Sequence, residues 1–69
     1  MIAQKVTEQM RRKWDKRVAF CLEHSDLLNN WEGFFMDSIE AQRSGSKDLS
    51  FRQVQKLYQI FKRVESDVG

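Results

Sequence analysis

The stretch that decides the fold is residues 49–64, which read LSFRQVQKLYQIFKRV. Ser50 and Gln53 have the spacing of a capping box, in which each side chain bonds the other residue's backbone N–H at the start of a helix. Leu49 and Val54 flank that start at the spacing of a hydrophobic staple. The helix expected over residues 51–65 has an apolar stripe made of Phe51, Val54, Leu57, Tyr58, Phe61 and Val64.

A second helix is expected just upstream. Asn29 or Asn30 can accept a backbone N–H as its N-cap, and Asn29 with Glu32 would form a variant of the capping box. Gly45 suits the left-handed position that commonly ends a helix. Gly33 costs about 1 kcal/mol relative to alanine in a helix interior, and one interpretation is that it lets another helix or a bulky ring approach closely. The apolar side expected for this helix, over residues 30–43, consists of Trp31, Phe34, Phe35, Ser38, Ile39 and Gln42.

The longest helix is expected at the N-terminus, over residues 3–24. Residues 25–30 then break the pattern with Ser, Asp and Asn, which favour caps and turns. Basic side chains project from a different side of this helix than the apolar ones. The apolar stripe comprises Val6, Met10, Trp14, Val18, Cys21 and Leu22.

Three amphipathic helices on short connections, in a chain without proline, predict an all-α protein. A length of 69 residues leaves room for one domain. We expect residues 1–69 to form a single compact three-helix domain, in which the long N-terminal helix packs on the helical hairpin. The tail, residues 66–69, is expected to fray.

Cysteine usage and hydropathy bear on location. Cys21 is the only cysteine, which fits a reducing compartment such as a cytoplasm. The N-terminal sequence MIAQKVTEQMRRK has no apolar signal region. No apolar run approaches the roughly 20 residues of a membrane span. We therefore expect a soluble, cytoplasmic protein without membrane contact.

The residue types that catalysis requires are scarce. His24 is the only histidine, and Cys21 lies one helical turn before it. A nucleophilic pair would need an orienting third group and an oxyanion site, and a metal site usually needs three or four Cys or His ligands. The sequence also has neither a phosphate-binding loop nor a dinucleotide fingerprint. We expect no enzyme activity, no cofactor, no metal and no small-molecule substrate, so the protein should act by binding.

The net charge of +2 is unevenly distributed. Residues 1–17 carry an excess of positive charge, residues 18–50 an excess of negative charge, and the remainder is weakly basic. A basic helix face can bind phosphates, or it can be a solvated surface that keeps a small protein soluble, and the sequence leaves both open. On the first interpretation the predicted phosphate contacts are Lys5, Arg12, Lys13 and Lys16, with Lys56, Lys62 and Arg63 as additions.

Most aromatic side chains lie at core spacing, and we expect them mainly inside the fold. Stacking on unpaired bases would require one of them to be exposed near basic residues. Phe20, Met36 and Ile60 fall off the main stripes of their helices. These three are the predicted members of an exposed apolar patch that docks a protein partner.

The second and third helices together carry an extended pattern of apolar and capping residues. It runs Trp31-x-x-Phe34-x-x-x-Ser38-Ile39, a basic break that contains glycine, then Leu49-Ser50-x-x-Gln53-x-x-x-Leu57-x-x-Ile60. In this pattern, which covers somewhat over half the chain, the sequence resembles the small companion proteins of UvsW, the recombination and repair helicase of T4-type bacteriophages. The resemblance implies a phage protein that works beside a DNA helicase in recombination and repair, with weak DNA binding. It carries over no catalytic residue.

Two functions are therefore predicted. The preferred one is an accessory DNA-binding module, weak and without sequence specificity on single- or double-stranded DNA, associated with a phage recombination helicase. The alternative is a protein–protein interaction adaptor that binds no nucleic acid. Added salt separates them, because phosphate binding weakens steeply with salt whereas apolar docking persists.

Overall fold

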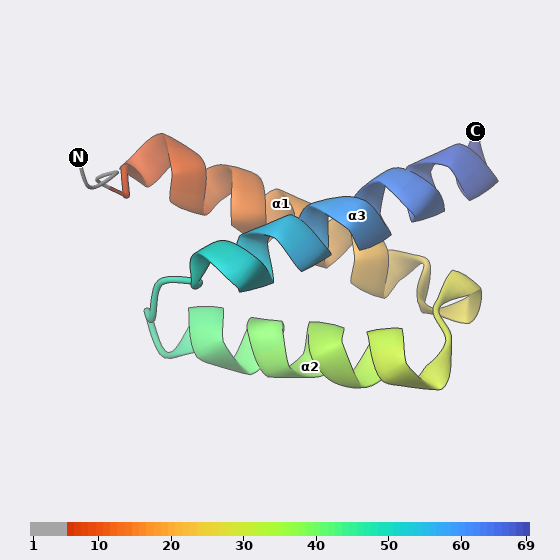
Figure 1. The fold of residues 1–69 in the computed structure, drawn as a ribbon, viewed down its shortest axis with the longest axis horizontal. Helices are drawn as coiled ribbons and strands as arrows, with labels where there is room; N and C mark the ends of the chain where they lie inside the picture. Colours follow the sequence, from red (N-terminus) through yellow and green to blue (C-terminus); the bar gives the residue numbers. More distant parts are fainter. Residues whose placement is uncertain (1–5) are drawn as a thin grey trace.

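The computed structural model describes residues 6–69, which form three α-helices (Figure 1). These are α1 (Glu8–Glu23), α2 (Asn30–Ser44) and α3 (Phe51–Val68), with a short 3-10 helix, η1 (Ser25–Leu27), between the first two. The described residues contain no strand. The all-α prediction is confirmed, and the helices are joined by short connections as expected.

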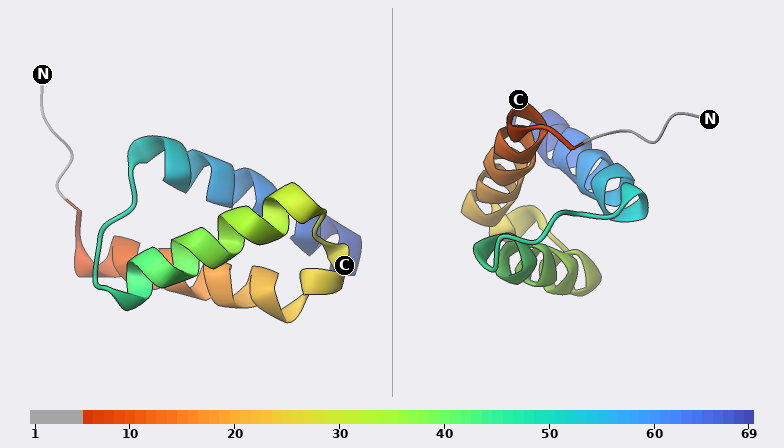
Figure 2. Two further views of the ribbon diagram at one scale, coloured as in Figure 1. Left: turned by 90° about the horizontal axis from the view of Figure 1, so that it is seen from below. Right: turned by 90° about the vertical axis from the view of Figure 1, so that its left-hand side faces the viewer.

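The chain runs up, down and up again. In Figure 1, α1 and α3 run in the same general direction, and α2 runs back in the opposite direction below both of them. Seen along the bundle, the three helices form a triangle (Figure 2). Since α1 packs on both α3 and α2, the expected packing of the N-terminal helix on a hairpin is also confirmed.

The core fills the centre of this triangle, and all three helices contribute to it. Trp14, Val18 and Cys21 enter from α1, and Leu49 closes one end from the loop before α3. Burying such side chains is the main favourable term in folding. The remaining buried apolar residues are Met36 and Ile39 from α2, and Leu57, Ile60 and Val64 from α3.

Both predicted capping boxes are present. The Glu32 N–H donates to Asn29 Oδ1 at 2.8 Å, and the Asn29 N–H donates to Glu32 Oε1 at 3.0 Å. The Gln53 N–H donates to Ser50 Oγ at 3.2 Å, and the Ser50 N–H donates to Gln53 Oε1 at 2.8 Å. Each box satisfies two N–H groups that the helix itself cannot bond.

The first helix begins later than predicted. Val6 and Thr7 are not helical, and Thr7 is the N-cap, its Oγ1 accepting the Met10 N–H at 3.2 Å. A threonine side chain competes for backbone N–H groups and therefore favours this boundary position. Residues 3–5 of the expected helix lie outside the described residues.

The predicted fraying of residues 66–69 is wrong for most of that segment, because α3 continues to Val68. An ion pair one turn apart, Arg63 to Asp67 at 3.0 Å, stabilises this end of the helix. The Gly69 N–H also donates to the Glu65 carbonyl at 2.9 Å.

The left-handed residue at the end of α2 is Ser46, with φ of 61°, and not the predicted Gly45, with φ of −84°. The Lys47 N–H donates to the Gln42 carbonyl at 3.0 Å, and the Ser46 N–H donates to the Arg43 carbonyl at 2.9 Å. This pair of bonds is the Schellman motif. Because the helix runs one residue further than expected, the left-handed position moves from glycine to serine.

The rotation of α2 differs from the prediction. Ile39 is buried and Phe35 packs against the core as predicted, but Glu32 and Met36 also face the core, while Trp31 and Phe34 are exposed by 55% and 73%. Both sets of residues have helical spacing, so periodicity alone could not decide between them.

Two further expectations about the surface are also wrong. Met36 and Ile60 are 0% and 3% exposed, so neither can belong to a surface patch, and Phe51, expected in the core, is 72% exposed. A Cβ added at Gly33 would meet no described heavy atom within 4 Å. The interpretation that Gly33 lets another helix or a bulky ring approach closely is therefore wrong.

Candidate nucleic-acid interface

One edge of α1 and the neighbouring edge of α3 form an open groove, which we call the α1/α3 groove. On α1, Lys13, Arg17 and Phe20 recur every three or four residues and so share one edge of the helix. Phe61, half-buried on α3, meets Phe20 edge-on with 5.3 Å between the ring centroids. The groove therefore has an apolar floor and a cationic rim. Its lining residues are Lys13, Lys16, Arg17, Phe20 and Phe61.

Arg17 connects the two helices through aromatic contacts. Its guanidinium carbon lies 4.8 Å from the centroid of the Tyr58 ring and 5.6 Å from that of Phe61. A cation at this distance is attracted by the negative face of an aromatic ring. Arg17 was absent from the predicted phosphate contacts. Its place one turn from Lys13 and Phe20 was visible in the sequence, but the rings facing it were not.

Lys62 stands beside the Arg17–Tyr58 pair. Its Nζ lies 3.1 Å from Glu65 Oε1, and this hydrogen bond is the main cause that raises the pKa of the Lys62 ammonium. Both side chains of the pair are about half exposed, so the ion pair is weak. Lys62 therefore adds to the positive charge beside the groove.

The predicted contacts on α1 differ in their surroundings. Arg12 Nε lies 3.9 Å from Glu8 Oε1, with both side chains largely exposed. Lys13 and Lys16 are exposed and form no ion pair within residues 6–69. Lys5 lies outside the described residues.

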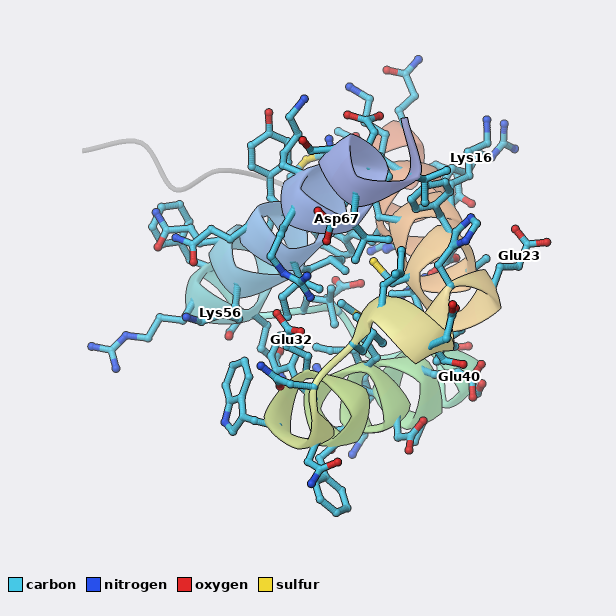
Figure 3. All side chains as sticks on the ribbon, turned by 90° about the vertical axis from the view of Figure 1, so that its right-hand side faces the viewer. Lys16, Glu23, Glu32, Glu40, Lys56 and Asp67 are labelled. Atoms are coloured by element: carbon cyan, nitrogen blue, oxygen red, sulfur yellow. The ribbon has the colours of Figure 1, made fainter. Side chains whose placement is uncertain are left out.

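Lys56 lies on another side of the molecule. Its Nζ is 5.3 Å from the centroid of the Trp31 ring, where both residues line a shallow pocket between α2 and α3. Figure 3 shows Lys16 and Lys56 projecting from opposite sides. The structure therefore does not bring Lys56 to the α1/α3 groove.

Arg63 is bound to other parts of the molecule. Its guanidinium donates to the carboxylate of Glu32, to the Leu27 carbonyl at 3.0 Å and to Asp67 at 3.0 Å. The Glu32 side chain is only 11% exposed, and a buried carboxylate needs a partner for its charge. Arg63 supplies that charge, so its structural role is to hold α3 against the start of α2.

Two further arginines fasten the α2–α3 loop to α1. Arg11 donates from Nε and Nη2 to the Asp48 carboxylate at 2.8 and 3.1 Å, and this bidentate bond holds the pKa of Asp48 below its ordinary value. Arg43 donates to Asp15 Oδ1 at 2.8 Å and to the Lys47 carbonyl at 2.8 Å. Arg11 and Arg43 therefore have structural roles, because their guanidinium groups are bound to carboxylates of the same molecule.

Three of the exposed acidic side chains of residues 18–50 lie on α2 and at the end of α1. Asp37 and Glu40 are exposed on α2, and Glu23 is exposed at the end of α1. Figure 3 shows Glu23 and Glu40 on the side of the molecule away from Lys56 and on the same side as Lys16. None of these three acidic residues lines the α1/α3 groove, but the charges of the two segments are not separated onto opposite sides of the molecule.

Residues 6–69 offer little other chemistry. Burial raises the pKa of the Cys21 thiol to about 11, so the thiol is protonated at neutral pH. The His24 ring packs on Phe20 with 4.7 Å between centroids. In this part of the chain no three His, Cys, Asp or Glu side chains gather as a metal site would require. None of the described helices is long and apolar enough to cross a membrane.

The chain matches no protein family, no curated protein and no solved structure. The resemblance to phage helicase companion proteins stays a prediction, and functional proposals rest on the geometry of the molecule.

Proposed function

We propose that the protein is an accessory nucleic-acid-binding module that attracts the DNA backbone to the α1/α3 groove. The observation that carries this proposal is that some basic side chains form ion pairs within the fold, whereas others form none. Arg11, Arg43 and Arg63 are bound to carboxylates, whereas Lys13 and Lys16 project into solvent without an ion-pair partner in residues 6–69. Lysines free of carboxylates can exchange their counterions for phosphates.

The mechanism is backbone attraction without base readout. Lys13 and Lys16 would contact phosphates directly, with Arg12 and Lys62 close by. Such contacts position a nucleic acid but carry no sequence information. Binding by a few cations is weak and falls as salt rises. The role suggested by the sequence, service beside a phage recombination helicase in the host cytoplasm, belongs to this proposal.

The test is the double charge reversal Lys13→Glu with Lys16→Glu, measured by fluorescence anisotropy on labelled DNA between about 50 and 200 mM salt. We expect weaker binding at low salt. The slope of log K against log salt should shrink by roughly 0.7 to 0.9 for each phosphate that the variant no longer neutralises.

The matched control is Lys47→Glu with Arg52→Glu, which changes the net charge equally at exposed positions outside the α1/α3 groove. This control should bind nearly as well as the wild type. Equal weakening of both double variants would show a general charge effect and contradict the assignment. Absence of wild-type binding at low salt would remove the proposal altogether.

A second candidate, the protein-interaction adaptor, now rests on different residues. Trp31 and Phe34 are exposed on α2, and the Trp31 ring stacks on Phe35 with 5.6 Å between centroids. Exposed aromatic side chains are typical of protein-binding surfaces. Binding of a protein partner that survives added salt and is abolished in Phe34→Gln would favour this function.

A further inference from the structure

Tyr58 combines two properties that no other aromatic side chain of the described residues shares. It is 45% exposed, and it lies at the basic rim, with the Arg17 guanidinium over its ring. Lys62 is near enough for Tyr58 and Arg17 to influence its pKa. An exposed ring among cations that converge from two helices is the arrangement that binds bases and phosphates together.

The other aromatics lack one of these properties. Trp14 is buried, and Phe20 and Phe61 form the apolar floor of the groove. Trp31 is exposed, but the cation over it is the single Lys56, and its neighbour Arg63 is bound to Glu32.

We infer that the α1/α3 groove takes single-stranded nucleic acid, with one unpaired base stacked on Tyr58 and the flanking phosphates on Lys13, Lys16 and Lys62. This inference rests on the proposed function and names its substrate class. Arg17 holds one side of the Tyr58 ring, so the ring is fixed before the base arrives and little side-chain freedom is lost on binding.

The bases of duplex DNA cannot stack on Tyr58. Its bases are already stacked and paired, and an aromatic ring on a helix surface reaches them only after a base is unstacked. A duplex would therefore meet the lysines alone. The inference predicts that a single strand binds more tightly than a duplex at the same salt concentration.

The test uses the full chain and three labelled probes: a single strand of about 12 nucleotides, a hairpin duplex, and an abasic strand of equal length. Tyr58→Leu should weaken binding of the single strand about tenfold, because the variant has no ring on which a base can stack. Binding of the duplex and the abasic strand should not change. Tyr58→Phe, which keeps the ring, and Trp31→Leu, outside the groove, should bind the single strand normally.

A second readout does not depend on any variant. Tyr58 is the only tyrosine, so its ring resonances are unambiguous in the NMR spectrum. They should move upfield on addition of the single strand and stay in place with the abasic strand. Deoxythymidine and uridine strands compared in the same titration show whether DNA or RNA is preferred.

The outcomes separate the two proposals. If the Lys13→Glu, Lys16→Glu variant loses binding while Tyr58→Leu keeps single-strand affinity and the ring resonances do not move, backbone binding stands and the inference is overturned. Equal loss of single-strand and duplex binding in Tyr58→Leu also overturns it. Absence of binding by the wild type removes both.

Discussion

Ser46 is a residue that the fold holds in an unfavourable conformation. It adopts φ of 61° in the Schellman motif that ends α2. The left-handed region costs an L-residue with a side chain roughly 1–2 kcal/mol, whereas glycine enters it freely. Ser46→Gly should therefore raise the free energy of unfolding by about 0.5–1 kcal/mol, after allowance for the flexibility of glycine in the unfolded chain.

Urea unfolding followed by circular dichroism measures this change. Ser44→Gly is the matched control, because Ser44 is the last helical residue of α2 and glycine there should destabilise by a similar amount. A Ser46→Gly protein no more stable than the wild type would show that the left-handed strain is absent in solution.

Ionisation of Cys21 should lower the free energy of unfolding at alkaline pH. Burial raises the pKa of its thiol to about 11, whereas in the unfolded chain the thiol ionises near its ordinary value of about 8.5. The folded state therefore favours the protonated thiol. The contribution of Cys21 to the free energy of unfolding is complete below about pH 8.5 and declines as the pH rises toward 11. The decline is at most about 1.4 kcal/mol per pH unit.

Comparison with Cys21→Ala isolates this contribution, because every other titratable group is the same in both proteins. The difference in unfolding free energy between wild type and variant should shrink as the pH rises. Parallel stability curves would mean that the thiol ionises equally easily in both states.

At the scale of the element, the starts of α2 and α3 were predictable because each depends only on residues that are close together in the sequence. A capping box needs only two side chains three positions apart, so Asn29 with Glu32 and Ser50 with Gln53 could be found without knowledge of the rest of the fold. The rotation of α2 was not predictable in this way. It depends on how Glu32 meets Arg63, which lies on another helix.

That contact between elements gives a prediction for stability. Arg63→Ala should leave the nearly buried Glu32 carboxylate without its cation and lower the free energy of unfolding by about 2 kcal/mol, less than for a fully buried pair because Arg63 is 42% exposed. DNA binding should stay close to the wild type. Thermal unfolding and anisotropy together check this, with Arg52→Ala, at an exposed arginine of the same helix outside the groove, as the control for both measurements. If Arg63→Ala weakened DNA binding and left the free energy of unfolding unchanged, Arg63 would be a phosphate contact and not a structural residue.

At the scale of the whole molecule, the sequence identified where the cations are but not which of them are available. Charge counting placed a basic excess in residues 1–17, and Lys13 and Lys16 indeed lie on an exposed face. It could not show that Arg11 is bound to Asp48 or that Arg17 lies over Tyr58. Both facts depend on residues more than thirty positions away in the chain, and no local pattern carries that information.

The groove between α1 and α3 also has a consequence for the order of events during synthesis. Its two walls come from α1 and α3, the first and last helices of the described residues. The chain returns through α2, and only then can α3 pack beside α1. Until a ribosome reaches Tyr58 and Phe61, Arg17 of α1 has been translated but the two rings that it contacts have not. The α1/α3 groove can therefore form only after α3 has emerged from the ribosome.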